Sequence, residues 1–147
     1  GWLDKQWGDF QPVAVEWDWA SIQLDDGTDL MLSLLYDRDG VPVENYATLR
    51  RPGGSPQTLK PDEFSFLPSG PEWRSIESRA TYKIEWKVDI PAHGIHLTLR
   101  PLSENAEFRG TLLPVTYWES GVDVTDETGQ LVGQGFIELN WAPGRAR

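Results

Sequence analysis

The feature that most constrains the fold is a strict two-residue alternation of apolar and charged side chains over residues 81–90. The apolar positions all point to one side of an extended chain, and they are Tyr82, Ile84, Trp86, Val88 and Ile90. A strand with one apolar and one charged face is typical of an antiparallel sheet that covers a core on one side. Residues 91–94 contain proline and glycine, after which Ile95, Leu97 and Leu99 resume the alternation. We therefore predict that the two segments form a hairpin.

The rest of the chain is divided into short segments of the same kind. Further strands are expected over residues 15–24, 28–36, 43–50, 63–67, 116–124 and 131–141. Residues 51–56 and 67–71 are rich in proline and glycine and are expected to be connections. No apolar stripe with helical spacing extends over three turns. These observations predict an all-β fold, either an antiparallel up-and-down β-barrel or a β-sandwich, and the periodicity does not choose between them.

Two segments carry additional information about packing. Residues 28–36 are apolar on both faces, which indicates that the outer face of this strand is covered as well. Gly133 and Gly135 lie two residues apart in an expected strand, where they predict a bend or a bulge rather than a phosphate-binding loop.

Size and charge limit the classes of function. The chain has 147 residues, which suits one domain over residues 1–147 with a single core. A formal net charge of −10 repels phosphate backbones, so nucleic acid is not expected as a partner. No apolar run approaches the roughly 20 residues that a membrane span requires. The chain contains no cysteine, which excludes disulfides, thiolate catalysis and cysteine-type zinc sites.

Four motifs in a fixed order carry a family resemblance. They are WLDKQWG at residues 2–8, WDWASIQLDDGTDLML at 17–32, YWESGV at 117–122 and GQGFIEL at 133–139. Together they resemble the C-terminal half of the AttH family, a group that includes predicted secreted hydrolases and carotenoid 1,2-hydratases (hydroxyneurosporene synthases).

The resemblance carries expectations about architecture and partners. It implies a lipocalin-like barrel that forms the C-terminal half of a longer protein with two barrels, so that the N-terminal barrel is the expected partner. It also implies an exported, periplasmic or cell-surface location. Family members often read Asp-His-Glu-Trp where this chain has Asp4, Lys5, Gln6 and Trp7. A histidine there is a plausible proton donor, so its replacement by Lys5 speaks against hydratase chemistry.

The aromatic residues are the first candidates for a site. Eight tryptophans occur in 147 residues, and flat aromatic walls suit a long apolar or polyene ligand, although core packing is the simpler interpretation. Trp17 and Trp19 share a strand face with Ser21 and Gln23, a mixed lining that favours a cavity inside the barrel. The candidate ligand-binding residues are Trp7, Trp17, Trp19, Ser21, Gln23, Tyr36, Tyr117 and Trp118.

Acidic residues beside these aromatics are the candidate catalytic groups. They are Asp4, Asp18 and Glu119. Protonation of a carbon–carbon double bond requires a carboxylic acid near an apolar pocket, and burial can keep such a group protonated. The alternative is that strand alternation points Asp18 to solvent and that Glu119 only accepts hydrogen bonds from a loop.

Other chemistries find no support in the sequence. No Gly-x-Ser-x-Gly elbow is present, so serine hydrolase activity is not expected. His93 and His96 lie at one turn without further ligands at matched spacing, so no metal site and no cofactor are predicted.

Three hypotheses for function therefore stand side by side. The first is binding of a hydrophobic polyene, terpenoid or lipid-like small molecule. The second is a cofactor-free hydratase or isomerase whose site is shared with the N-terminal barrel. The third is a structural domain that supports its partner.

Overall fold

The computed structural model describes residues 16–37, 39–111 and 116–140. Its elements are β1 (Glu16–Leu24), β2 (Asp29–Tyr36), β3 (Pro42–Arg50), β4 (Gln57–Leu59), β5 (Ser65–Arg74), β6 (Thr81–Ile90), the 3-10 turn η1 (Pro91–His93), β7 (Ile95–Pro101), β8 (Glu107–Arg109), β9 (Thr116–Thr125) and β10 (Leu131–Asn140). No helix in this part of the chain is long and apolar enough to cross a membrane.

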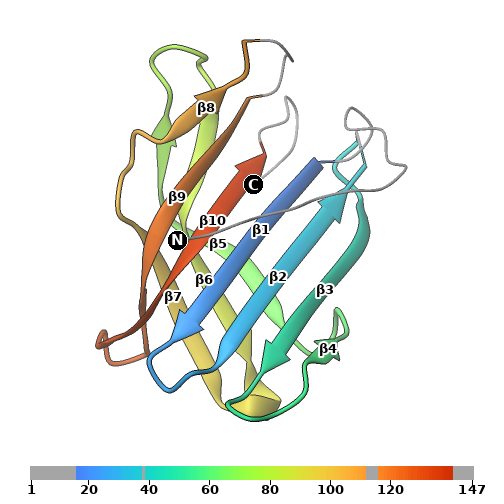
Figure 1. Cartoon of the computed structure of the whole chain (residues 1–147). Helices are drawn as coiled ribbons and strands as arrows, with labels where there is room; N and C mark the ends of the chain where they lie inside the picture. The colour runs from blue at the N-terminus through green and yellow to red at the C-terminus, as the bar shows by residue number, and fades with distance from the viewer. Residues whose placement is uncertain (1–15, 38, 112–115, 141–147) are drawn as a thin grey trace.

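All ten strands belong to one curled antiparallel sheet (Figure 1). Its order is β4-β3-β2-β1-β10-β9-β7-β6-β5, and β8 pairs with the upper part of β9. Strands that follow each other in sequence are mostly neighbours, and β1 pairs with β10, the last of the described strands. The sheet curls into a lipocalin-like barrel that stays open between β4 and β5, for which the described residues include no pairing. Of the two predicted architectures, the barrel is confirmed.

The strongest sequence signal coincides with its structural element. The alternation at residues 81–90 forms β6, and its five apolar side chains are buried. The chain then turns through η1, which ends at Gly94 in the left-handed conformation with φ of 62°, and it returns as β7. The predicted hairpin is confirmed, and it provides one wall of the core.

The curl of the sheet depends on two glycines in β10. A Cβ at Gly133 would lie 2.3 Å from the Gln23 carbonyl oxygen, and one at Gly135 would lie 2.6 Å from the Ser21 carbonyl oxygen. The register also shifts between Leu131 and Gly133. The predicted irregularity is therefore present, and it lets β10 approach the backbone of β1 more closely than a side chain would allow.

Three features of the sheet differ from the predictions. Residues 67–71 were expected to be a connection, but β5 continues through them with a register shift between Ser69 and Glu72. β5 is the last strand of the sheet, and an edge strand tolerates proline because one row of its N–H groups needs no partner. The strands β4 and β8 were not predicted, since each has three residues and too few positions to show an alternation.

The core fills the concave side of the sheet. Its largest fully buried side chains are Trp86, Trp118, Tyr82, Phe66, Ile22, Leu30, Leu32, Leu49, Ile90, Leu99, Ile137 and Leu139. They come from strands on both sides of the β1–β10 pair, so the barrel holds a single core.

Candidate functional site

The two faces of β1 assign the predicted site residues to opposite sides of the sheet. Ala20 and Ile22 belong to the buried core, with Leu32 and Leu30 opposite them on β2. Alternation then turns Trp17 and Trp19 to the convex side, where both are half-buried. The expectation that these tryptophans line the inside of the barrel is wrong, because the inward positions of β1 carry smaller side chains.

On the convex side, a row of cross-strand neighbours brings two carboxyl groups together. Glu119 on β9 lies opposite Glu138 on β10, and Glu138 lies opposite Trp19 on β1. The indole N–H of Trp17 donates a hydrogen bond of 2.7 Å to Glu138 Oε1. Directly opposite side chains in a sheet are about 5 Å apart at Cβ, so the two carboxyl groups are within reach of one another.

Partial burial raises the pKa values of Glu119 and of Tyr117, which lies two residues before it on β9. Desolvation raises the pKa of Glu119 above the ordinary value for a glutamate. The pKa of Tyr117 is also raised, first by desolvation and then by the negative charges of Glu119 and Glu138. Glu119 is thus a carboxyl group that keeps its proton to a higher pH than an exposed glutamate does.

Strand β8 and the residues before it flank this row. The Phe108 ring lies 4.9 Å from the Tyr117 ring, measured between centroids. The Ala106 carbonyl accepts a hydrogen bond of 3.2 Å from the Glu119 backbone N–H. We call the set Trp17, Trp19, Tyr117, Glu119 and Glu138 the aromatic–acidic face.

A hollow of about 450 Å³ adjoins the aromatic–acidic face, one row further along the same strands. It is lined by Gln23, Leu102, Gly121, Val122, Gln134, Gly135 and Phe136. Gln23 is thus a predicted site residue that borders a cavity, on the convex side. Ser21, also predicted, is buried beside this hollow, because it lies directly opposite Phe136.

The other predicted residues belong to the concave side or lie outside the described residues. Asp18 is only 1% exposed and faces the core, so the alternative of a solvent-facing Asp18 is wrong. Trp118 is fully buried, and its indole N–H donates to the Glu104 carbonyl at 2.7 Å. Tyr36 packs against the edge of the core. Asp4 and Trp7 lie outside the described residues.

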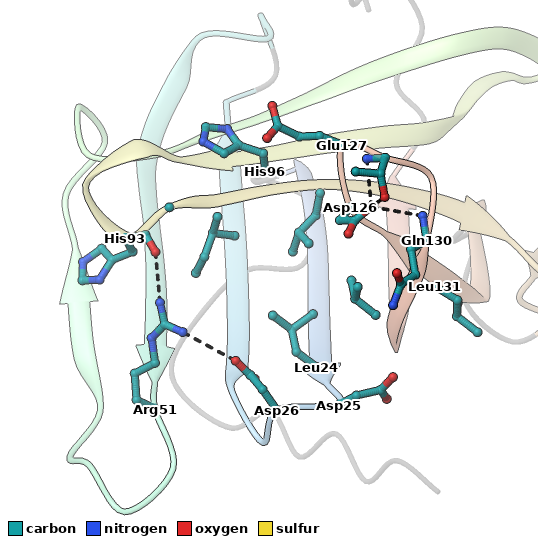
Figure 2. Close-up of a pocket in the computed structure, with 15 residues that line it drawn as sticks. Leu24, Asp25, Asp26, Arg51, His93, His96, Asp126, Glu127, Gln130 and Leu131 are labelled. Atoms are coloured by element: carbon teal, nitrogen blue, oxygen red, sulfur yellow. Dashed lines mark hydrogen bonds and ion pairs between the residues drawn. The ribbon is translucent and has the colours of Figure 1, made fainter.

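A second hollow, of about 500 Å³, lies at the end of the barrel that carries the β1–β2, β6–β7 and β9–β10 turns (Figure 2). Its floor is apolar and its rim consists of turns between strands, with Asp26, Arg51 and Asp126 on it. Arg51 donates to the His93 carbonyl at 3.0 Å and lies 3.6 Å from Asp26. Asp126 accepts hydrogen bonds within its own turn. Arg51 thus links two of the turns on the rim, whereas Asp126 stabilises the turn to which it belongs.

Metal-binding side chains do not gather in the described part of the chain. No group of three or more His, Cys, Asp or Glu residues there could hold a metal ion. His96 pairs with Asp89 at 2.9 Å on the surface of the β6–β7 hairpin.

One residue of the aromatic–acidic face was missed by the sequence analysis. Glu138 alternates with the buried Ile137 and Leu139, and this pattern predicts only that its side chain points away from the core. Register, which the sequence does not contain, brings it opposite Glu119.

Comparisons with known proteins agree with this architecture. The family model described as AttH-like matches residues 1–141. The crystal structure of an AttH protein from Nitrosomonas europaea is similar, with a TM-score of 0.75 and 32% identity, over 92% of this chain and 41% of that one. Kievitone hydratase from Nectria haematococca has the same fold, with a TM-score of 0.70 and 21% identity, over 93% of this chain and 42% of that one. A search of curated proteins gives no match.

Proposed function

Because the chain belongs to the AttH-like family, we propose that it is the C-terminal barrel of a two-barrel protein and contributes a wall to a hydrophobic ligand site. The ligand class is a polyene, a terpenoid or a lipid-like molecule. The wall is the aromatic–acidic face on the convex side of the sheet. The observation that carries the proposal is a desolvated carboxyl group, Glu119, set among half-buried aromatic side chains outside the packed core.

The contrast between the two sides of the sheet supports this location. The concave side is occupied by the protein's own large side chains, among them Trp86 and Trp118. On the convex side, aromatic rings lie next to a hollow of about 450 Å³. Aromatic walls with few polar groups are typical of sites for apolar small molecules.

Length supports a site shared with a second domain. The chain spans about two fifths of the AttH protein and of kievitone hydratase, 41% and 42% of their lengths. We infer that the rest of the full-length protein includes a second barrel. That barrel packs over the aromatic–acidic face and closes the site from the other side.

A second candidate function, hydration or isomerisation of the bound ligand without a cofactor, is favoured by the two opposed carboxyl groups. In this reaction Glu119 gives its proton to one carbon of a double bond, so a C–H bond forms as the π bond breaks. A water oxygen then bonds to the other carbon and releases a proton to the Glu138 carboxylate. Transfer of that proton back to Glu119 restores both groups, and the net reaction adds one water.

Ligand titration of the full-length protein tests the binding function. We expect carotenoid-like or fatty ligands to quench tryptophan fluorescence. By calorimetry, Trp19→Ala weakens binding about tenfold or more, as loss of a central aromatic contact commonly does. The matched control is Trp73→Ala, which removes a half-buried tryptophan on β5. If no such ligand binds, or if both variants bind like the unaltered protein, the domain has a structural role instead.

Hydration is tested separately by substitution of the acid. Glu119→Gln is expected to lower the rate of water addition at least about a hundredfold, because the amide cannot give up a proton. Glu72→Gln changes an exposed glutamate on β5 and serves as the control. Ligand binding without water addition would support a binding protein and contradict the enzyme. Water addition at an unchanged rate in Glu119→Gln would contradict the role of Glu119 as the acid.

A further inference from the structure

Residues 102–109, which we call the strap, run along the first half of β9, residues 116–121. The strap flanks the aromatic–acidic face. Its only strand, β8, has three residues and pairs with β9 alone. Two backbone hydrogen bonds also join strap and strand: Leu102 N–H donates to the Gly121 carbonyl at 2.9 Å, and Glu119 N–H donates to the Ala106 carbonyl at 3.2 Å. A strand this short is marginal by itself, so its position depends on side-chain contacts.

The main side-chain contact is made by Glu107, on the concave side of the strap. Its carboxylate accepts three hydroxyl hydrogen bonds, from Ser75 at 2.8 Å, Ser78 at 2.5 Å and Tyr82 at 3.0 Å. Ser75 and Tyr82 are buried. Hydrogen bonds to an ionised acceptor are roughly twice as strong as neutral ones, so this cluster ties the strap firmly to β6 and to the turn between β5 and β6.

Two of the groups that bind Glu107, Ser75 and Ser78, belong to the turn between β5 and β6, which is held by its own hydrogen bonds. Ser75 Oγ accepts the backbone N–H groups of Glu77 and Ser78, and Ser78 Oγ accepts that of Ala80. Ser75 N–H donates to the Ala80 carbonyl at 2.9 Å, which closes the turn between β5 and β6. The same two serines thus organise the turn and bind Glu107.

We propose that Glu107 is a positioning residue that fixes the strap beside Glu119 and thereby completes the aromatic–acidic face. This inference rests on the proposed function of that face. The strap puts the Phe108 ring against Tyr117 and the Ala106 backbone carbonyl against the Glu119 N–H, while the Ala106 side chain packs against the core. A detached strap would admit water to Glu119 from the side of β8.

The strands next to Glu119 carry the following titratable and apolar groups. Tyr117 lies on β9 itself, and Glu138 faces Glu119 from β10. From β8, Phe108 packs on Tyr117, and the Glu107 carboxylate points to the concave side, where it binds Ser75 and Tyr82. Desolvation is the cause of the raised pKa of Glu119, so loosening the strap is expected to lower it toward the ordinary value.

The test compares variants of the full-length protein without ligand. Glu107→Ala removes all three hydroxyl contacts, and Glu107→Gln keeps the size of the side chain while weakening them. Glu77→Ala is the control, because it breaks the exposed ion pair with Arg109 that joins the same two segments. The readouts are amide hydrogen exchange of residues 102–109 and the titration midpoint of the Glu119 carboxyl by carbon-13 NMR.

We expect Glu107→Ala to raise exchange in the strap about tenfold or more and to lower the Glu119 midpoint, with Glu107→Gln intermediate and Glu77→Ala unchanged. If Glu107→Ala does not fold, Glu107→Gln alone decides. A folded variant with unchanged strap exchange and an unchanged Glu119 midpoint would overturn the inference. Because both readouts need no ligand, they are independent of the binding test, whose failure would instead overturn the proposed function.

Discussion

Glu119 is a partly buried carboxyl group with a raised pKa, and the reaction proposed above requires a carboxyl group that holds its proton. Burial of a carboxylate is unfavourable, and the raised pKa of Glu119 measures that cost in the folded protein. Tyr117 responds to the same environment with a raised pKa of its own. This residue therefore reduces the stability of the domain at neutral pH, as functional groups often do.

Glu119→Gln is predicted to stabilise the protein at alkaline pH. Because the folded state holds the Glu119 proton more tightly than the unfolded state does, stability falls as pH rises from the ordinary glutamate pKa through the raised one, and it stays reduced above. Glutamine has no such dependence. Thermal unfolding should therefore show a higher melting temperature for the variant at pH 8 and a vanishing difference at pH 3. An equal effect at both pH values would contradict desolvation of the carboxylate as the cause.

Gly133 is predicted to tolerate no side chain. The Cβ of Gly133→Ala would lie 2.3 Å from the Gln23 carbonyl oxygen, and backbone atoms cannot move aside as a flexible side chain can. We expect a loss of about 3 kcal/mol in the free energy of unfolding, measured by urea denaturation. Gly121→Ala is the matched control, since its Cβ would meet the exposed Leu102 side chain at 3.1 Å, and it should cost less than about 1 kcal/mol. Equal losses would show that the close approach of β10 to β1 does not matter.

At the level of elements, the sequence predicted the long strands except for most of β5, and it did not predict the two three-residue strands. β6 shows its alternation over ten residues, whereas β4 and β8 have three residues each. The extension of β5 through Pro68 and Pro71 depends on its place at the sheet edge, which follows from topology rather than from local sequence. Elements whose existence depends on tertiary neighbours are thus the ones that pattern alone misses.

The turns at the lower end of the barrel should open locally without unfolding the domain. Arg51→Ala removes the hydrogen bond to the His93 carbonyl and the ion pair with Asp26 (Figure 2). Both groups of the ion pair are about half exposed, 47% and 58%, so the expected loss in stability is at most about 1 kcal/mol. Amide exchange should nevertheless rise in residues 51–56 and 91–94. A large loss of global stability would mean that this end of the barrel supports the core.

For the whole molecule, the fold class could be predicted from periodicity, but the side of the sheet to which the candidate site residues point could not. Alternation places Trp17 and Trp19 on one face of β1 and Asp18, Ala20 and Ile22 on the other. Size and hydrophobicity favour the tryptophans as the inward set, yet Ala20 and Ile22 are the side chains that the core buries. A choice between two faces depends on the curvature of the complete sheet, which no single strand encodes.

The proposed site on the convex side would also explain why β2 has apolar side chains on both faces. Leu30, Leu32 and Leu34 fill the core, while Met31 and Leu35 are half-buried on the convex side. We propose that the second barrel of the full-length protein covers these side chains, so that one sheet serves a core on one side and a ligand site on the other.

Fluorine NMR of the full-length protein labelled with 5-fluorotryptophan tests most directly on which side of the sheet the ligand binds. Single Trp→Phe substitutions assign the resonances of Trp17, Trp19, Trp86 and Trp118. On addition of a carotenoid-like or fatty ligand, we predict that the Trp17 and Trp19 resonances shift while those of Trp86 and Trp118 stay unchanged. Shifts of Trp86 and Trp118 with no change at Trp17 and Trp19 would place the ligand inside the barrel and contradict a site on the convex face.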